Sequence, residues 1–526
     1  MSYISVGFAI LTFICFLLFY FVPLKFKKYI LLTASCVFYI CSSKYLIILP
    51  VVNTLFIYFL SIKIDKVNEA FNAKKKELSK EERKEAKKQN SKVKKRICTV
   101  EIVLSFLLLA VFKYMGFFTG IINDISESLS LGSIPLLSLM VPLGISYYTL
   151  SIAGYAIDVY RGTLKAEKNY CKLLLFTVYF PHIVEGPIGN YKSFSSQLDK
   201  INKPDFEAFM TGIQIILFGL MKKMIIADRA GIAANQFFDN YEQYGFTTSL
   251  AGMILYAVNI YFDFSGCIDI VRGVSCLFGI ELPENFRQPF FSKSVQEFWR
   301  RWHITLGDWI KKYIFYSVSM SKINRKIISL CDKIKNEYFK TTVPMFYALA
   351  FVWLFNGIWH GASWKYILYG VYYYIIICAG LIFEPLFEKI CAKLKINREG
   401  KAFGIFRILR TSVLVVIGLT LFRADSTYDF IQIIKSVFVY LDPAGNISDY
   451  YNSINLSLLD FVIVVLFTGL MFFISYKKEK GTDFIGWFAE HKRARWILCT
   501  AEILVIIILG VYGSSFTRLP FVYAQF

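Results

Sequence analysis

The chain contains only four histidines, so each one can be weighed separately as a possible general base. His360 lies in the segment FNGIWHGASW, where a hydrophobic stretch ends between two glycines. A neutral imidazole is costly to bury without a partner, and ionisable residues within membrane spans usually have a function. Histidine is also the natural group to deprotonate a hydroxyl near pH 7. His360 is therefore the first candidate for a general base, and a hydrogen-bonded packing histidine is the alternative.

His303 lies in the segment EFWRRWHITLGDW, which predicts an amphipathic helix with tryptophan anchors, among them Trp302, at a membrane interface. Two neighbouring cations, Arg300 and Arg301, could bind phosphate on a donor such as a coenzyme. They could equally contact lipid headgroups. The pattern leaves His303 as either an active-site residue or one more interfacial side chain.

Asp263 lies beside apolar residues in the segment NIYFDFSGCID. A carboxylate at the bilayer centre costs roughly 2.5–3.5 kcal/mol. Asp263 therefore needs a partner, and Arg287, Arg300 and Arg301 are the candidates. A structural ion pair agrees with the pattern as well as a catalytic role does.

The two remaining histidines give weaker signals. His182 precedes Glu185 in FPHIVEGPIG and is expected to be structural or to line an entrance, whereas His491 in HKRAR is expected on the solvated surface. The eleven cysteines are scattered without CxxC or Cys/His metal spacing, so we expect no metal site. The sequence also lacks a P-loop, a GxSxG motif and an HExxH motif.

The elements that must position these residues are predicted to be membrane helices. The chain is 56% hydrophobic and only 18% charged, whereas soluble proteins carry about 25% charge. The mean hydropathy is +0.50. With roughly 20 apolar residues needed per span, we expect an all-α polytopic protein with about 11–13 transmembrane helices, plus re-entrant and interfacial helices. The clearest candidate spans are 4–22, 29–42, 46–62, 98–118, 207–227, 248–264, 342–358, 364–386, 405–422, 457–475 and 496–513.

The net charge of +21 is concentrated in segments between these spans. The most basic segment, residues 63–97, is expected to be a cytoplasmic loop that contains a solvated helix, because short basic loops stay inside. Residues 284–340 are expected to form an interfacial region. The charge sets orientation and could contact anionic lipid, whereas no recognition module suggests nucleic acid.

The stretch 134–190 is apolar but interrupted by proline and glycine. Such breaks predict re-entrant or cavity-lining pieces, with simple proline kinks as the alternative. No internal repeat or soluble domain is visible. We therefore expect one integral membrane domain, residues 1–526, that ends in C-terminal helices within 425–526.

Several blocks, in order along most of the chain, resemble the membrane-bound O-acyltransferase family, in particular its bacterial branch similar to alginate O-acetyltransferases. The blocks are VPLGISYYTLSIAGYAIDVYRG, YFPHIVEGPI, GLMKKMIIADR, YFDFSGCIDI, LPENFRQPF, SVQEFWRRWHITLGDW, GIWHGASW, LFRADS and PFVYAQF. The resemblance implies that His360 is the catalytic histidine and His303 fills the second active-site position. It also implies a ring of helices around a thin central layer, open to the acyl donor from the cytoplasm and to the acceptor from outside.

This sequence departs from the family pattern at three positions. Lys312 stands where many relatives have an acidic residue, Tyr373 replaces a frequent histidine, and Ser151 replaces a frequent glutamine. These differences leave the implied reaction class alone. They concern the identity of the donor and the acceptor.

The expected mechanism has no bound cofactor and takes its acyl group from a cytoplasmic thioester, with acetyl-CoA as the implied donor. His360 would act as general base on an acceptor hydroxyl. His303 would orient or polarise the donor carbonyl or bind the developing oxyanion. The supporting residues are Asn356, Ser363, Trp359, Trp302, Asp263, Arg300 and Arg301.

The implied setting is a multi-pass protein of a bacterial cell membrane that O-acetylates an exported cell-surface polysaccharide. The expected partners are an extracellular acetyltransferase or esterase-like protein, a polysaccharide synthase complex and membrane lipid. Three alternatives stay open: D-alanyl transfer to teichoic acid from a carrier protein, a transporter or flippase, and a scaffold for polysaccharide export.

Overall fold

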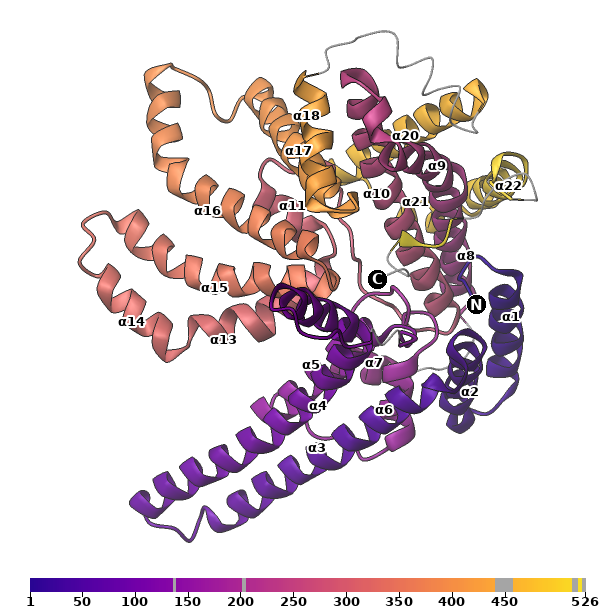
Figure 1. The fold of residues 1–526 in the computed structure, drawn as a ribbon. Helices are drawn as coiled ribbons and strands as arrows, with labels where there is room; N and C mark the ends of the chain where they lie inside the picture. The colour runs from indigo at the N-terminus through magenta and orange to yellow at the C-terminus, as the bar shows by residue number, and fades with distance from the viewer. Residues whose placement is uncertain (136–138, 201–204, 440–456, 513–518, 523–526) are drawn as a thin grey trace. The chain divides into compact units, whose positions relative to one another are not determined.

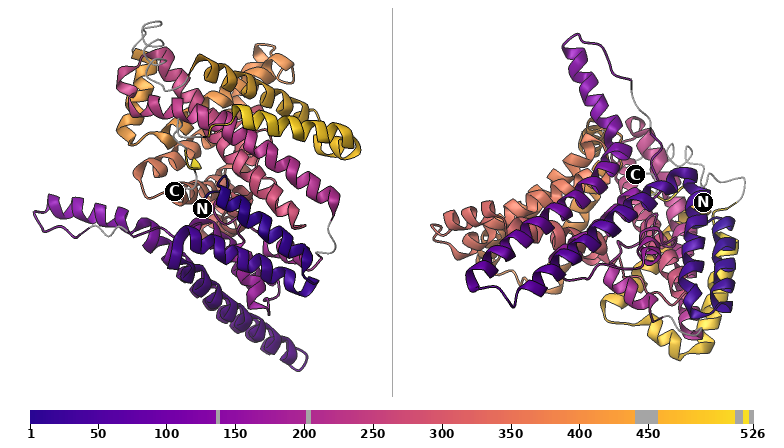
Figure 2. Two further views of the ribbon diagram at one scale, coloured as in Figure 1. Left: turned by 90° about the vertical axis from the view of Figure 1, so that its right-hand side faces the viewer. Right: turned by 90° about the horizontal axis from the view of Figure 1, so that it is seen from below.

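The computed structural model describes residues 1–526 except 136–138, 201–204, 440–456, 513–518 and 523–526. Nearly all of the described chain is helical (Figures 1 and 2), which confirms the all-α prediction. Strand-like pairing within the described ranges is limited to one isolated bridge, between Phe286 and Trp302.

The first helices include the longest one of the chain, α4. They are α1 (Val6–Phe21), α2 (Leu24–Ser43), the 3-10 helix η1 (Lys44–Ile47), α3 (Ile48–Lys74), α4 (Lys80–Ser128), α5 (Ile145–Arg161), α6 (Tyr170–Val178), α7 (Tyr191–Leu198) and α8 (Phe206–Met221).

The later helices include two π-helical segments, η2 and η5. They are η2 (Lys222–Ala227), α9 (Asp228–Asp239), η3 (Tyr241–Gln243), α10 (Phe246–Leu277), η4 (Pro289–Phe291), α11 (Val295–Arg301), α12 (Ile304–Ile310), η5 (Lys311–Phe315), α13 (Tyr316–Ser319), α14 (Lys322–Cys331), α15 (Glu337–His360), α16 (Trp364–Lys393), α17 (Lys401–Arg423), α18 (Thr427–Val439), α20 (Leu458–Glu479), α21 (Phe484–Glu490) and α22 (Lys492–Leu509).

Eight helical stretches of the described chain are long and apolar enough to cross a membrane, so the protein is a multi-pass membrane protein. The number is smaller than the predicted 11–13. The predicted spans 29–42 and 46–62 form one stretch, Leu24–Lys74, because only the short η1 turn separates them. The first predicted span has 16 residues in α1, and the last, α22, carries charged residues in and near its first turn.

The chain divides into two compact units, residues 1–212 with 271–282 and residues 213–270 with 283–526. The single domain and the ring around a central layer stay predictions.

The first unit contains a long antiparallel hairpin of α3 and α4, visible in both figures. Its tip lies between Lys74 and Lys80, and Ser79 caps α4 by a reciprocal pair of hydrogen bonds with Glu82. The basic segment 63–97 thus consists of the end of α3, a short turn and the start of α4, and it contains the predicted solvated helix. Capping and charge pairs along a solvated helix explain why the polar sequence stays helical.

Breaks interrupt the chain in 134–190 as predicted. Helices α5 and α6 are separated from each other and from α7 by non-helical segments. At the start of α5, Gly144 has φ +64°, and a Cβ there would collide with the carbonyl oxygen of Ile183. Glycine is required at this position because the backbone is left-handed and tightly packed.

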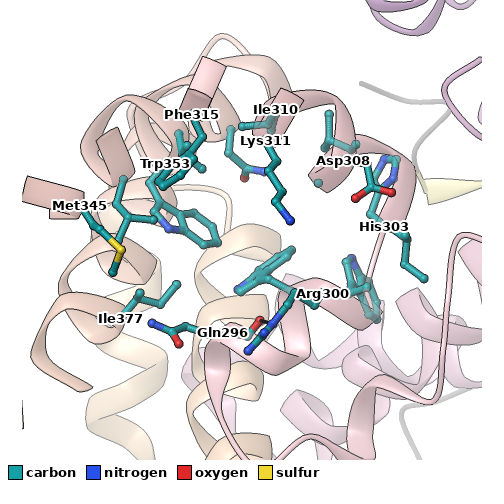
Figure 3. A pocket seen from close by; sticks show the side chains of 18 of the residues that line it. Gln296, Arg300, His303, Asp308, Ile310, Lys311, Phe315, Met345, Trp353 and Ile377 are labelled. Atoms are coloured by element: carbon teal, nitrogen blue, oxygen red, sulfur yellow. Dashed lines mark hydrogen bonds between the residues drawn. The ribbon is translucent and has the colours of Figure 1, made fainter. Parts of the chain in front are cut away.

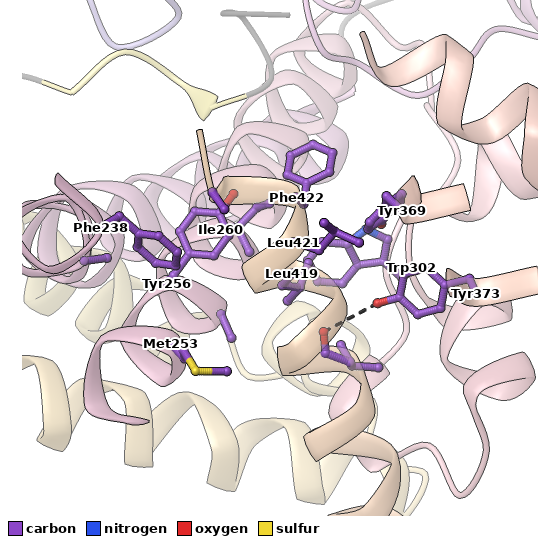
Figure 4. Close-up of a cluster of buried hydrophobic side chains, with 14 of the residues drawn as sticks. Phe238, Met253, Tyr256, Ile260, Trp302, Tyr369, Tyr373, Leu419, Leu421 and Phe422 are labelled. Carbon is purple, nitrogen blue, oxygen red and sulfur yellow. Dashed lines mark hydrogen bonds between the residues drawn. The ribbon is translucent and has the colours of Figure 1, made fainter. Parts of the chain in front are cut away.

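The second unit contains a large hydrophobic core, rich in aromatic rings, to which α9, α10, α16 and α17 contribute (Figure 4). Helices α15 and α16 form a hairpin, and a Cβ at Gly357 would collide with the carbonyl oxygen of Tyr366. The glycine lets the two backbones approach closely, as small residues do in membrane helix pairs. Trp302 and Phe422 belong to the same core.

Candidate active site

A cavity of about 580 Å³ in the second unit brings the two candidate histidines together (Figure 3). Both His303 and His360 line it. Its wall is formed by α11, α12, η5, α15 and α16. The lining residues are Gln296, Trp299, Arg300, Trp302, His303, Ile304, Leu306, Gly307, Asp308, Ile310, Lys311, Phe315, Met345, Leu349, Val352, Trp353, Asn356, His360, Ile377 and Leu381.

His360 is the last residue of α15, as the sequence predicted from the end of the hydrophobic stretch. Only 3% of the residue is exposed, but it is not sealed off, because it lines the cavity. Aromatic rings hold the imidazole on several sides: its centroid lies 5.0 Å from Trp359, 5.7 Å from Tyr369 and 5.1 Å from Phe422.

The glycines on either side of His360 let two segments of the chain approach closely. A Cβ at Gly361 would collide with the ring of Tyr366, as one at Gly357 would with that residue's carbonyl oxygen. Both glycines therefore make room for the start of α16 rather than for a substrate. Close packing of the two helices fixes the place at which His360 leaves α15.

The segment around His303 is not one amphipathic helix, contrary to the prediction. Helix α11 ends at Arg301, and α12 begins at Ile304. His303 lies between them in the left-handed region, with φ 47°, and is 3% exposed. The break arises because this segment pairs with residues 285–287: Arg287 N–H donates to the Arg301 carbonyl, and Ile304 N–H donates to the Asn285 carbonyl. A non-glycine residue held in this conformation often marks a functional site.

Asn285 also fixes the tautomer of His303. The side-chain oxygen of Asn285 accepts from the backbone N–H of Thr305 at 3.0 Å and from its hydroxyl at 2.9 Å. The Nδ1 atom of His303 lies 3.3 Å from the same oxygen, so this nitrogen must donate. Burial lowers the pKa of His303 to about 3. His303 is therefore neutral near pH 7, and Nε2 is the nitrogen that can accept a hydrogen bond.

Three of the predicted supporting residues lie at the histidine pair. The Trp359 ring contacts both imidazoles: its centroid lies 5.7 Å from the ring centroid of His303 and 5.0 Å from that of His360. Trp302 and Asn356 are buried and line the cavity. The side-chain oxygen of Asn356 has no hydrogen-bond partner among the described residues, which leaves this acceptor available to a ligand.

Of the predicted supporting residues Arg300, Arg301 and Ser363, only the first belongs to the cavity wall. Arg300 lines the cavity. Arg301 does not, because its guanidinium is bound by Glu297 and by Glu479, each at 2.7 Å. Ser363 precedes α16 as its N-cap residue and is not part of the cavity wall.

Asp263 pairs with a lysine rather than with any predicted arginine. Lys223 Nζ lies 2.6 Å from Asp263 and 2.8 Å from Asp228, and all three side chains are buried. The second oxygen of Asp263 accepts from the backbone N–H of Val522 at 2.7 Å. The partner was missed because the π-helical segment η2, which turns Lys223 toward α10, leaves no clear sequence pattern.

A second cavity of about 340 Å³ lies on the other side of the aromatic rings that enclose His360. Tyr366 and Phe422 contact the imidazole and also line this cavity. Its wall is polar and includes carboxylates, cations, amides and aromatic rings. The lining residues are Asn235, Asp239, Tyr256, Asn259, Asp263, Lys365, Tyr366, Phe422, Arg423, Asp425, Leu519, Pro520 and Val522.

The remaining histidines agree with their predicted roles. His182, in the first unit, is buried among Phe176, Tyr179 and Phe194, which makes it structural. His491 is exposed and stacks on Trp487 at 4.2 Å. In the part of the chain that the structure describes, no group of three or more His, Cys, Asp or Glu residues could hold a metal ion.

Sequence reasoning missed two residues of the site. Asn285, which orients His303, lies in LPENFRQPF, and no local pattern links it to a histidine 18 residues later. Lys311 lines the cavity from η5. The run of charged residues around it was visible in the sequence, but the π-helical segment η5, which begins at Lys311, was not.

Comparison with known proteins gives one family and several relatives. Residues 133–331 match the membrane-bound O-acyltransferase family. A probable alginate O-acetylase of Azotobacter vinelandii is 28% identical over 78% of this chain and 72% of its own length. A peptidoglycan O-acetyltransferase of Helicobacter pylori is 29% identical over 66% and 63%. A teichoic acid D-alanyltransferase of Bacillus subtilis is 32% identical over 47% and 60%.

Proposed function

We propose that this chain, a membrane O-acyltransferase whose residues 133–331 carry the domain of the membrane-bound O-acyltransferase family, passes an acetyl group from a thioester to a hydroxyl during O-acetylation of an exported bacterial polysaccharide. Relatives named as acetylating alginate or peptidoglycan support an acceptor of this class. The donor would enter from the cytoplasm, with acetyl-CoA as the first candidate.

The cavity that contains both histidines is the proposed donor site. His360 removes the proton of the acceptor hydroxyl while the hydroxyl oxygen attacks the thioester carbonyl. The C–S bond then breaks, and the sulfur takes up the proton and leaves as a thiol. The neutral His303 orients the donor by accepting a hydrogen bond at Nε2, for example from an amide N–H of a pantetheine arm. Asn356 lines the same cavity, and the NH2 group of its carboxamide can donate to the oxyanion that develops on the carbonyl.

The polar second cavity is the proposed route of the acceptor. It offers charged and amide side chains for hydroxyl groups, together with aromatic faces. Tyr366 and Phe422 line this cavity and also contact the imidazole of His360. Movement of these rings would let a hydroxyl reach the base, whether it belongs to the polymer or to an extracellular transferase that passes the acetyl group on.

D-alanyl transfer from a carrier protein is the second candidate, supported by the relative that is named as a D-alanyltransferase. A D-alanyl thioester carries an ammonium group that needs a carboxylate nearby. Asp308 is the one carboxylate among the residues that line the donor cavity. Replacement of Asp308 by Asn should therefore leave acetyl transfer nearly unchanged, but should weaken D-alanyl transfer if that is the reaction.

The observation that carries the proposal is that His303 and His360, both buried from the outer surface, line the same cavity. The test is His360→Ala, with His491→Ala as the control at an exposed position. We expect the acetylation rate of the first variant to fall by a factor of about 10²–10⁴, because the general base is absent. The rate of the second variant should equal that of wild type. The readout is the O-acetyl content of the exported polysaccharide in cells that lack the wild-type protein, with protein levels matched.

The same experiment separates the enzyme from the alternatives of another class. A flippase or a scaffold would need neither imidazole, so the His360→Ala variant would keep polysaccharide export and acetylation. Full acetylation by this variant would overturn the proposed function.

A further inference from the structure

Helix α14 carries a cationic face that the protein itself does not neutralise. Lys322, Arg325 and Lys326 are exposed, and at 3.6 residues per turn they lie within about 100° of one another around the helix. The helix contains no Asp or Glu. Arg325 donates to the backbone carbonyl of Met320, and none of the three cations forms an ion pair with a described residue.

Exposed apolar side chains lie on both flanks of this cationic face. Ile323 and Leu330, 57% and 65% exposed, lie on one flank, and Ile328, 42% exposed, lies on the other. The remaining side of α14 carries the buried Asn324 and Cys331, and the helix packs against α15. The cations therefore point away from the protein. Exposed apolar and cationic side chains on one helix are typical of a helix that lies in a membrane interface.

The place of α14 in the chain agrees with such an interface. The five residues 332–336 connect α14 to α15, which is long and apolar enough to cross a membrane, and Figure 1 shows the two helices side by side. Residues 311–340 contain eight Lys or Arg and two acids, a net charge of +6. Because positive segments next to a span stay on the cytoplasmic side, we expect α14 at the headgroups of that leaflet.

We infer that α14 binds anionic phospholipid of the membrane that the protein spans. The lipid phosphates contact Lys322, Arg325 and Lys326, and the acyl chains cover Ile323 and Leu330. An arginine binds phosphate through parallel N–H groups, and a lysine adds a point charge. Each cation close to an anionic lipid surface favours binding about fivefold. Lipid binding at α14 does not depend on the proposed reaction.

The same lipid stabilises a segment that reaches the cavity of the two histidines. Helix α13 connects α14 to η5, and both α13 and η5 pack against α15. Lys311 and Phe315 of η5 line the cavity. Because a ligand that binds only the folded state stabilises it, anionic lipid should raise the melting temperature of the protein through this segment.

Photo-crosslinking tests the lipid site in the intact protein. Full-length wild type is placed in phosphatidylcholine nanodiscs with a trace of phosphatidylglycerol that carries a photoactivatable acyl chain, or with phosphatidylcholine that carries the same chain. Chymotrypsin, which does not cut at Lys or Arg, releases peptides for mass spectrometry. Phosphatidylglycerol should label residues 322–331 of wild type at least about tenfold more than phosphatidylcholine, since three cations contribute.

The variant for this test combines Lys322→Gln, Arg325→Gln and Lys326→Gln. Its α14 should be labelled equally by the two lipids, because the charge is gone while the apolar flanks remain. Phosphatidylglycerol added to the nanodiscs in bulk should also raise the melting temperature of this variant less than that of wild type. All three positions are exposed, so the variant should fold as wild type does.

The matched control combines Lys84→Gln, Lys87→Gln and Lys88→Gln and removes the same charge from exposed positions of α4. Lys84 precedes Arg96, the cation next to the apolar part of α4, by 96 − 84 = 12 residues. This separation corresponds to about 18 Å, more than twice the screening length of about 8 Å. The control should therefore keep the labelling of α14 and the lipid-dependent rise in melting temperature.

Three results would overturn the lipid site. Wild-type α14 could be labelled equally by both lipids, or the α14 variant could keep the preference for phosphatidylglycerol. In either case the cations do not select the lipid. Absence of labelling by both lipids would place α14 outside the interface, and its cations would then fit a soluble acidic protein instead.

Discussion

His303 is kept neutral by burial and by a hydrogen-bond arrangement that reaches it from residues 285–287. Its pKa is lowered to about 3, below the value of about 6.5 expected in the unfolded chain. Between these values only the unfolded chain binds the proton. The contribution of His303 to stability is thus fully present above pH 6.5 and is lost as the pH falls toward 3.

This linkage predicts that acid destabilises wild type more than His303→Gln. Melting temperatures in detergent at pH 7 and pH 5 measure the effect, and the comparison of the two proteins removes groups they share, including His182, whose pKa burial lowers to about 4. The variant should lose fewer degrees on acidification. An identical loss in both proteins would show that His303 is protonated as easily in the folded state.

At this scale the sequence predicted the residues better than their partners. His360 and His303 were found because an imidazole within apolar sequence needs a reason to be there. Asn285 and Lys223 were not, because contacts over 18 and 40 residues depend on how helices pack. The predicted partner of Asp263 was wrong for the same reason. The three candidate arginines are closer to Asp263 along the sequence, but the buried Lys223 is the residue that contacts it in the folded structure.

The hairpin of α15 and α16 determines where His360 lies, and its two helices approach each other closely at Gly357. A Cβ at Gly357 in α15 collides with the Tyr366 carbonyl, whereas Gly380 in α16 has nothing within 4 Å of its Cβ position. The two glycines are thus a matched pair. One is required by packing, and the other is open to substitution.

We expect Gly357→Ala to destabilise the protein by about 1–3 kcal/mol, the usual cost of overpacking, and to lower acetylation because His360 moves. Gly380→Ala should be neutral or slightly stabilising, since alanine favours the helix. Melting temperature and O-acetyl content are measured for both variants. Wild-type stability and activity of Gly357→Ala would mean that the helices can separate without disturbing the site.

Helix type and hydrophobic stretches could be predicted from periodicity, but helix ends at the site could not. The motif around His303 has the pattern of one amphipathic helix, yet pairing with residues 285–287 breaks it. Lys223, which is buried, and Lys311, which lines the cavity, likewise lie in the π-helical segments η2 and η5. In each case a long-range contact or a one-residue insertion overrides the local pattern.

For the whole molecule, charge and hydropathy predict orientation. Helix α4 contains 49 residues, which corresponds to about 73 Å, more than twice the hydrocarbon thickness of about 30 Å. Its first part is basic and exposed, and its later part is apolar. One end of α4 must therefore project from the membrane, and the positive-inside rule assigns that end, with the α3–α4 tip, to the cytoplasm.

This orientation predicts which side of the membrane a protease can reach. A protease site inserted in the tip at residues 75–79 should be cut only in inverted vesicles, whereas one inserted after Gly132, beyond the other end of α4, should be cut only in right-side-out vesicles. Both positions are exposed, so the insertions should leave the melting temperature unchanged. Cleavage of both sites from the same side would mean that α4 does not cross the bilayer. Reversed cleavage would leave α4 as a span but would place its basic end, and with it the charge-based orientation of the chain, outside.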